Sequence, residues 1–213
     1  MDAAGADPGG PALFSATGLA CSRGERLLFE GLGFALHGGE WLHVKGANGS
    51  GKTTLLRTLV GLSPPDSGRM TWRGVDIRDD LPAFRRAMIY VGHPAAVKDD
   101  LTPLENLRLA LALDGMTTGD DALVAALTRF RLDDHQDLPA RHLSAGQKRR
   151  VLLARLLLRP AALWILDEPF AALDVPAINL LGSLLRAQLD AGGIAVVTSH
   201  QTVPLAASQE LTL

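Results

Sequence analysis

A glycine-rich segment ending in lysine and threonine has the clearest chemical signal in this chain. It runs from Gly46 to Thr53 as GANGSGKT, the spacing G-x-x-x-x-G-K-[ST] of a phosphate-binding loop. Glycines let successive backbone N–H groups point at phosphate oxygens, and a following helix presents its positive end to the same anion. Lys52 adds positive charge near the terminal phosphates, and the Thr53 hydroxyl can bind Mg²⁺. The predicted nucleotide-binding residues are Gly46, Ala47, Asn48, Gly49, Ser50, Gly51, Lys52, Thr53 and Thr54.

Acidic and imidazole side chains follow two further apolar runs. Asp167 and Glu168 come directly after 162–166, and His200 follows 194–197 closely. Beside a phosphate loop, Asp167 is predicted to hold Mg²⁺ through its water shell, and Glu168 to act as general base on the attacking water. His200 can donate to the γ-phosphate and orient that water. An acidic turn and a structural histidine are the alternatives. The predicted catalytic residues are Glu168, His200 and Lys52, and the predicted metal ligands include Thr53 and Asp167.

A second candidate anion site opens a later helix. The segment 143–147 has the sequence LSAGQ, which puts a serine, a small residue and a glycine at a helix N-terminus. Ordinary capping by Ser144 is the alternative. The first loop already accounts for the terminal phosphate of one nucleotide. The residues alone therefore do not identify a ligand for this second site.

Strands and helices in alternation must position these side chains. Continuous apolar runs at 41–45, 87–91, 162–166 and 194–197 are typical of strands buried on both faces of a mainly parallel sheet. Helices are predicted over 51–60, 104–113, 121–130, 146–158 and 175–189. Because ligands bind beyond the carboxyl ends of such strands, the polar residues that follow them are expected to meet at one crevice. The predicted fold class is α/β.

The length of 213 residues suits a single domain. We expect a disordered lead over 1–11 and one domain over 12–213, with its core at about 12–91 and 160–213 and a helical subdomain at about 92–159. The 21 basic and 23 acidic side chains give a net charge of -2, so there is no electrostatic case for a nucleic-acid partner. No apolar run approaches the roughly 20 residues that cross a bilayer.

These motifs, in this order, resemble the nucleotide-binding domain of ABC transporters over about 13–213. The segment 46–53 resembles the Walker A loop, 143–147 the family signature, 163–168 Walker B, 172–174 the D-loop, and His200 the switch histidine. The resemblance implies a P-loop NTPase with a mainly parallel sheet core, a small antiparallel β portion near the N-terminus and an inserted helical subdomain. It implies ATP and Mg²⁺ as cofactors and ATP hydrolysis coupled to transport.

The resemblance also implies a head-to-tail homodimer that encloses two ATP molecules. Ser144 and Gly146 of one copy would contact the γ-phosphate that Lys52 holds in the other, and Asp174 would lie at the boundary. ATP binds the closed pair, so it drives closure by linkage. On this basis the nucleotide-binding set extends to Ser144, Ala145, Gly146, Gln147 and Asp174.

The sequence departs from the family pattern at two places. His93 stands where the family usually has a glutamine that reaches Mg²⁺, so His93 joins the predicted metal ligands. The segment 19–24 lacks the aromatic residue that commonly stacks on adenine, and Arg23 is predicted to stack there through its planar guanidinium. Weak discrimination between ATP and GTP is expected.

Within the family, local features resemble the ATP-binding subunit of the haem exporter of cytochrome c maturation. These features are 21–26, 41–44, 90–93, and Lys98 ahead of 101–107. They imply an integral membrane permease subunit that docks near 93–106, and a peripheral location on the cytoplasmic face of the bacterial inner membrane. Haem is not expected to bind this chain, because its single cysteine, Cys21, lacks the paired cysteine and histidine of covalent attachment. A buried thiol is expected instead.

Three alternatives remain. One is a soluble ABC-type ATPase not coupled to transport, which the single domain and the lack of a heptad run between Lys52 and Ser144 disfavour. Another is the ATPase subunit of an exporter for a different substrate. The third is a module that closes on ATP without turnover, which the intact residues Lys52, Asp167, Glu168 and His200 disfavour.

Overall fold

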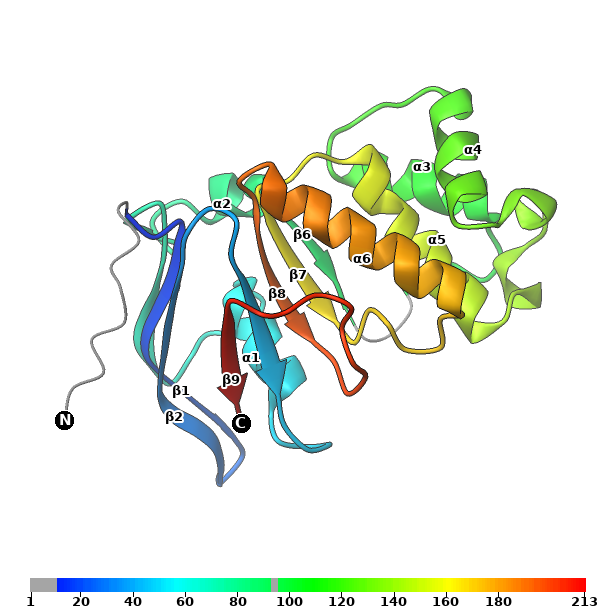
Figure 1. The fold of residues 1–213 in the computed structure, drawn as a ribbon. Helices are drawn as coiled ribbons and strands as arrows, with labels where there is room; N and C mark the ends of the chain where they lie inside the picture. The colour runs from blue at the N-terminus through cyan, green and yellow to red at the C-terminus, as the bar shows by residue number, and fades with distance from the viewer. Residues whose placement is uncertain (1–10, 93–95) are drawn as a thin grey trace.

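Two β-sheets and six α-helices form the described part of the chain in the computed structural model, which covers residues 11–92 and 96–213. The strands are β1 (Phe14–Arg23), β2 (Arg26–Leu36), β3 (Trp41–Lys45), β4 (Ser67–Trp72), β5 (Val75–Asp76), β6 (Met88–Val91), β7 (Leu163–Asp167), β8 (Ile194–Thr198) and β9 (Gln209–Thr212). The helices are α1 (Lys52–Leu59), α2 (Leu81–Ala87), α3 (Pro103–Leu113), α4 (Asp120–Arg129), α5 (Ala145–Leu158) and α6 (Val175–Asp190). One sheet is parallel, with the order β6-β7-β8-β3-β9, and the other is antiparallel, with the order β2-β1-β4-β5 (Figure 1). The α/β prediction is confirmed.

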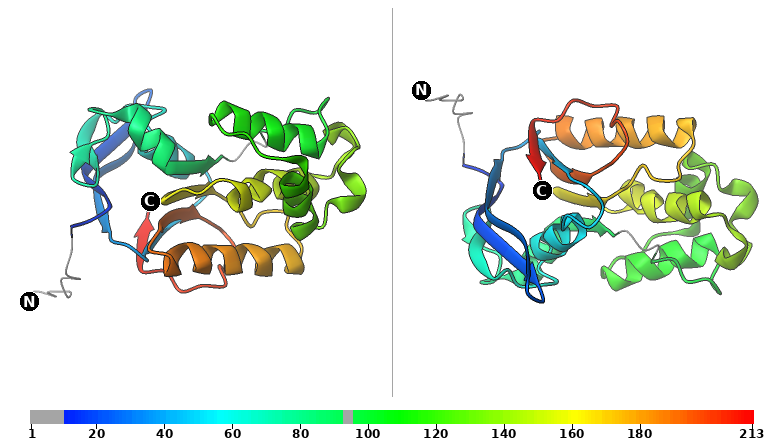
Figure 2. Two further views of the ribbon diagram at one scale, coloured as in Figure 1. Left: turned by 90° about the horizontal axis from the view of Figure 1, so that it is seen from above. Right: turned by 90° about the horizontal axis from the view of Figure 1, so that it is seen from below.

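The strands β7 and β8 lie inside the parallel sheet because both are apolar along almost their whole length. Their side chains alternate between two hydrophobic cores, with Ile165 and Val196 in one and Trp164 and Val197 in the other. The first core includes α1 and the second includes α5 and α6, so α1 and α6 cover opposite faces of the sheet (Figures 1 and 2). The two strands pair in register up to their last residues, which brings the polar groups at their carboxyl ends to one edge.

The antiparallel sheet packs against α1 on the side away from the parallel sheet. Phe14 of β1 stacks on Phe84 of α2 with ring centroids 5.6 Å apart, and both belong to the core that includes α1. The helix α2 begins where Asp80 caps it by accepting from Ala83 N at 2.9 Å. It ends at Ala87, so β6 begins one residue later than the sequence predicted. Cys21 is buried, as expected, with its Sγ 3.4 Å from Thr58 Oγ1.

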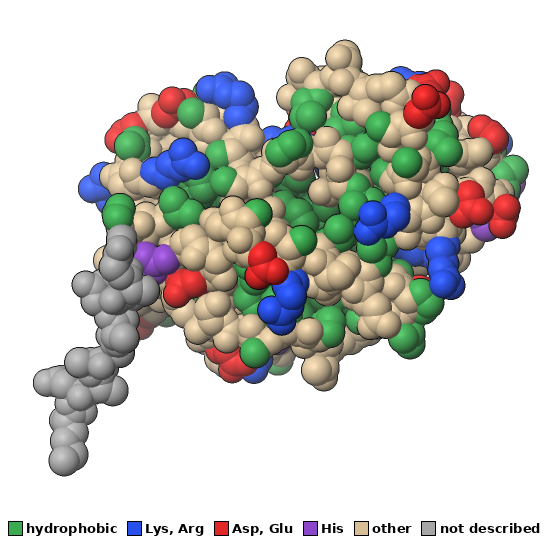
Figure 3. Space-filling model, turned by 45° about the horizontal axis from the view of Figure 1, so that its top comes forward, with side chains coloured by type: hydrophobic (Ala, Val, Ile, Leu, Met, Phe, Trp, Pro, Cys, Tyr) green, Lys and Arg blue, Asp and Glu red, His purple; other side chains and the backbone are tan. Residues whose placement is uncertain are grey.

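The helices α3, α4 and α5 pack together at the end of the molecule away from the antiparallel sheet (Figure 2). Thr102 and Glu105 form a reciprocal cap at the start of α3. All three helices lie within 92–159, and the division of the domain into a core and a helical subdomain stays a prediction. Over the described ranges, no helix is both long and apolar enough to cross a membrane. Basic and acidic side chains are interspersed on the face shown in Figure 3.

Candidate nucleotide-binding site

The phosphate loop joins β3 to α1, and its glycines adopt conformations that other residues avoid. Gly46, Gly49 and Gly51 have φ angles of 151°, 78° and 109°. A Cβ atom on Gly46 would lie 2.5 Å from Ser50 Oγ and 2.9 Å from the carbonyl oxygen of Leu213. The helix α1 begins directly after Gly51, and within the described residues no side chain caps it. The N–H groups of its first turn are therefore available to an anion.

Lys52 is folded back onto its own loop. Its Nζ donates to the carbonyl oxygens of Gly46 at 2.7 Å and Ala47 at 3.2 Å, and it lies 3.0 Å from His200 Nε2. The ammonium group thus lies at the mouth of the loop, between the loop and the end of β8.

Asp167 is held by two threonines. The Thr53 hydroxyl donates to Asp167 Oδ2 at 2.9 Å, and the buried Thr198 hydroxyl donates to Asp167 Oδ1 at 2.8 Å. Thr198 Oγ1 also accepts from Glu168 N at 2.8 Å. These contacts bring the hydroxyl and carboxylate oxygens predicted as Mg²⁺ ligands next to each other across the gap between α1 and β7.

Glu168 follows β7 in a left-handed conformation, with φ at 48°. Its Oε2 accepts from His200 N at 3.1 Å, and its Oε1 lies 3.4 Å from His200 Nε2. Glu168 thereby lines the same cleft as Lys52 and His200. The three predicted catalytic residues are all brought together.

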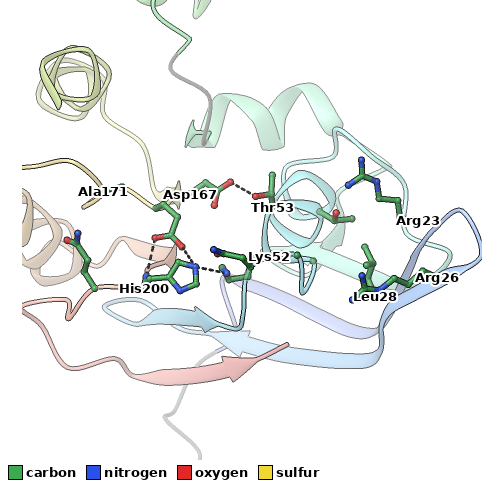
Figure 4. Close-up of a pocket in the computed structure, with 14 residues that line it drawn as sticks. Arg23, Arg26, Leu28, Lys52, Thr53, Asp167, Ala171 and His200 are labelled. Carbon is green, nitrogen blue, oxygen red and sulfur yellow. Dashed lines mark hydrogen bonds and ion pairs between the residues drawn. The ribbon is translucent and has the colours of Figure 1, made fainter. Parts of the chain in front are cut away.

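A cleft of about 720 Å³ runs over these groups. Figure 4 shows Lys52, Thr53, Asp167 and His200 pointing toward one another, with Arg23, Arg26 and Leu28 at the other end. Its size suits a small-molecule ligand. The lining residues are Arg23, Arg26, Leu28, Asn48, Gly49, Gly51, Lys52, Thr53, Thr54, Asp167, Glu168, Ala171, His200 and Gln201. Four of these lining residues were not predicted: Arg26 and Leu28, close to Arg23 along the chain, and Ala171 and Gln201, close to Glu168 and His200.

Two groups close to the acidic pair have shifted pKa values. Burial lowers the pKa of the Arg149 guanidinium, and the charges of Asp167 and Glu168 partly offset that effect. Burial raises the pKa of the Tyr90 phenol, and the charge of Asp167 adds to the shift. Arg149 remains a cation at neutral pH, so a positive charge lies behind the two carboxylates.

The LSAGQ segment forms a separate corner. Ser144 caps α5, accepting from Gln147 N at 3.2 Å, while Gln147 Oε1 accepts from Ser144 N at 2.7 Å. A Cβ atom on Gly146 would clash with the carbonyl oxygen of Ala172. Asp174 caps α6. None of Ser144, Ala145, Gly146, Gln147 and Asp174 is among the described residues that line the cleft. The predicted metal ligand His93 lies outside the described residues.

Comparison with known proteins identifies the family. The model of the ABC transporter family matches residues 29–171, about two thirds of the chain. The chain belongs to the ABC transporter family. Both the fold class and the assignment as an ABC-type ATPase are thereby confirmed.

Several relatives place this ABC protein more narrowly. It is 51% identical to the "Cytochrome c biogenesis ATP-binding export protein CcmA" of Methylococcus capsulatus, over 88% of this chain and 91% of that protein. It is 47% identical to the protein of the same name from Dechloromonas aromatica, over 94% of this chain and 100% of that protein. The resemblance to the ATP-binding subunit of cytochrome c maturation is confirmed.

Solved ABC structures share the fold. An ATP-binding subunit of an ABC transporter is similar with a TM-score of 0.77 and 30% identity, covering 88% of this chain and 80% of that one. A dimeric ATP-binding cassette bound to ADP and Pi, in a post-hydrolysis state, is similar with a TM-score of 0.76 and 25% identity, covering 88% of each chain.

Proposed function

We propose that this chain is the ATP-hydrolysing subunit of a membrane ABC complex that serves cytochrome c biogenesis, through export of haem or its release from a carrier. The names of the relatives support the biological role. The observation that carries the chemistry is the single cleft in which Lys52, Thr53, Asp167, Glu168 and His200 converge from α1, β7 and the end of β8.

Mg²⁺ fits the oxygen donors present in the cleft. Thr53 Oγ1 and Asp167 Oδ2, the two proposed ligands, already lie 2.9 Å apart, and hard oxygen donors with room for water are what Mg²⁺ prefers. When bound, the ion supplies positive charge that neutralises the phosphates. Thr198 holds the second carboxylate oxygen and so fixes the direction of the first.

The remaining residues bind the triphosphate and move a proton. Lys52 exchanges its carbonyl partners for β- and γ-phosphate oxygens, beside the N–H groups of α1. Glu168 accepts the proton of the water that adds to the γ-phosphorus, while the bond from that phosphorus to the ADP oxygen breaks. His200 donates to the γ-phosphate and orients the water. Arg23 lies where the base would stack, and weak discrimination between ATP and GTP follows from the lack of an aromatic platform in 19–24.

A second copy of the chain completes the site in this proposal. The Ser144 corner lies outside the cleft of its own chain, yet it is built as an anion site at the N-terminus of the 14-residue helix α5. In a head-to-tail homodimer, Ser144, Ala145, Gly146 and Gln147 would face the partner's γ-phosphate, and Asp174 would lie at the boundary. His93 is proposed as a further residue near the metal.

The membrane-spanning part of the complex is proposed to be a separate permease subunit. The chain would act as a peripheral protein on the cytoplasmic face of the bacterial inner membrane, with 93–106 near the permease. Haem would bind elsewhere in the complex, since Cys21 is buried between β1 and α1. No nucleic-acid partner is proposed.

The catalytic proposal is tested by comparing Glu168→Gln with the wild-type chain. We expect the variant to bind Mg·ATP and accumulate as an ATP-bound dimer, while its turnover falls by about 10²- to 10⁴-fold, the usual effect of losing a general base. Glu210→Gln is the matched control, because Glu210 pairs with Lys45 outside the cleft and its loss should leave turnover unchanged. Equal turnover in Glu168→Gln and wild type would remove Glu168 from the mechanism, and failure of the wild type to bind Mg·ATP would reject the ATPase assignment.

The biological proposal is tested in the host cell. Deletion of the gene should abolish haem-stained c-type cytochromes, and the wild-type chain but not Glu168→Gln should restore them. Normal c-type cytochromes in the deletion strain would contradict the proposed role, and capture of the chain from detergent-solubilised membranes should bring down the permease subunit.

A further inference from the structure

Arg149 is a buried cation that the proposed ATP chemistry does not use. It lies on α5 five residues after Ser144, and only 6% of its surface is exposed. Its Nη1 donates to the carbonyl oxygen of Gly92 at 2.9 Å, and its Nη2 donates to the carbonyl oxygen of Asp167. The ion pairs on this helix are made by other residues, Lys148, Arg150 and Arg155. Burying a guanidinium against backbone oxygens is costly, so a role beyond packing is indicated.

The two carbonyl groups belong to the ends of neighbouring strands. Gly92 directly follows β6, and Asp167 is the last residue of β7, while Val91 and Leu166 pair just before them. The Arg149 guanidinium donates hydrogen bonds to both carbonyl oxygens at the point where the pairing of β6 with β7 ends. Its donors stand in a rigid planar fork, so it fixes the separation of the two strand ends in a way that a lysine, with a single ammonium, does not.

The Tyr90 side chain packs closely against Gly92, the residue that follows β6. A Cβ atom on Gly92 would lie 3.1 Å from the Tyr90 hydroxyl oxygen, so the Tyr90 ring covers Gly92 closely. A Cβ atom at 92 would require this ring to shift by a few tenths of an ångström. The main chain at Gly92 is therefore held between the Tyr90 ring and the guanidinium.

We propose that Arg149 is a positioning residue for ATP hydrolysis, which fixes the main chain of the metal-binding Asp167 relative to the end of β6 and to the helix that carries the Ser144 corner. The inference rests on the proposed function. Thr53 and Thr198 hold the Asp167 carboxylate, and Arg149 holds its backbone. Through this one side chain, the two phosphate-binding corners of the chain share a rigid connection.

Arg159 offers a matched control at the opposite end of β6. It is also 6% exposed, and its Nη1 donates to the carbonyl oxygen of Met88, the first residue of β6, at 2.6 Å. Its Nε lies 3.0 Å from Asp114 Oδ2. Arg159, which directly follows α5, thus anchors the other end of the same strand, and it does not line the cleft.

The experiment compares Arg149→Lys and Arg159→Lys in the full-length chain. Without nucleotide, Arg149→Lys should speed amide hydrogen exchange at 90–92 and 166–168, and Arg159→Lys should do so near 88. With Mg·ATP, kcat of Arg149→Lys should fall by about 10- to 100-fold, as for other residues that orient a metal ligand. Its KM for ATP should stay within about twofold of wild type, since the phosphate loop is untouched. Arg159→Lys should keep kcat within about twofold of wild type.

A second variant keeps the test decisive if Arg149→Lys folds poorly. Gly92→Ala retains the guanidinium but crowds the Tyr90 ring against the end of β6, and it should also lower kcat without raising KM. The inference is overturned if kcat falls no further in Arg149→Lys and Gly92→Ala than in Arg159→Lys, if KM rises in place of the loss in kcat, or if exchange at 166–168 is unchanged. A wild-type chain that does not bind Mg·ATP would instead reject the proposed function, and the positioning role with it.

Discussion

Thr198→Val removes one hydroxyl group on which two site residues depend. The Thr198 side chain is fully buried at the end of β8. Its hydroxyl donates to Asp167 Oδ1 and accepts from Glu168 N, both at 2.8 Å. Valine keeps the shape of the side chain, so the substitution removes these hydrogen bonds without opening a cavity.

The structure allows the size of the effect to be worked out. A hydrogen bond to a charged group contributes about 1.5–3 kcal/mol, and a buried N–H left without a partner costs about 1–3 kcal/mol. The free energy of unfolding of Thr198→Val should therefore fall by about 2.5–6 kcal/mol. kcat should fall too, because the Asp167 carboxylate and the Glu168 backbone each lose the hydrogen bond to Thr198 that holds them in place.

Urea unfolding of the nucleotide-free chain measures this change. Thr58→Val is the matched control, because Thr58 is equally buried but its hydroxyl contacts a weak partner, Cys21 Sγ, at 3.4 Å. That variant should lose less than about 1 kcal/mol. If Thr198→Val is no less stable than Thr58→Val, the hydroxyl does not hold the acidic pair and the reasoning fails.

Two further predictions concern the phosphate loop and the antiparallel sheet. Gly46→Ala should lose Mg·ATP binding, measured by calorimetry. The Cβ atom of the variant would clash with Ser50 Oγ, and alanine at φ 151° is strained by about 1–3 kcal/mol. Wild-type affinity in this variant would contradict the loop geometry. The hydrogen bonds from Arg78 lower the pKa of Asp76 to about 2, from an ordinary 3.8. A lowered pKa stabilises the fold above the ordinary value, and this stability is lost as the pH falls through about 2. The free energy of unfolding should thus fall less steeply between about pH 4 and pH 2 in Asp76→Asn than in wild type, and equal slopes would count against the ion pair.

The elements around the phosphate loop could be predicted because their signals are local. The run 41–45 is β3 as observed, and β7 and β8 begin or end within a residue of the predicted runs. Buried parallel strands need apolar residues on both faces, and tight turns around phosphate need glycine, so both leave a short and specific pattern. Helices such as α5 and α6 were predicted to within a residue for a similar reason, since Ser144 and Asp174 cap their first turns.

The residues that were missed owe their roles to tertiary contacts. The antiparallel strands β1 and β2 pair with several register shifts, which blur the alternation that would identify them. Arg26 and Leu28 reach the cleft only because β2 passes beside α1. Arg149 stands between Lys148 and Arg150 in a run of basic residues, and nothing in that run tells which one is buried. Thr198 did leave a signal, as a polar residue that ends an apolar strand.

The contacts that Lys52 makes within the chain affect how strongly a triphosphate binds. Its ammonium has two carbonyl oxygens and an imidazole nitrogen as partners. An arriving anion competes with these internal acceptors, so the lysine contributes to affinity only the difference between two satisfied states. After hydrolysis the ammonium can return to the same partners, and this favours release of the cleaved product. On the proposed function, we therefore expect Lys52 to add less to nucleotide affinity than a lysine without internal partners would.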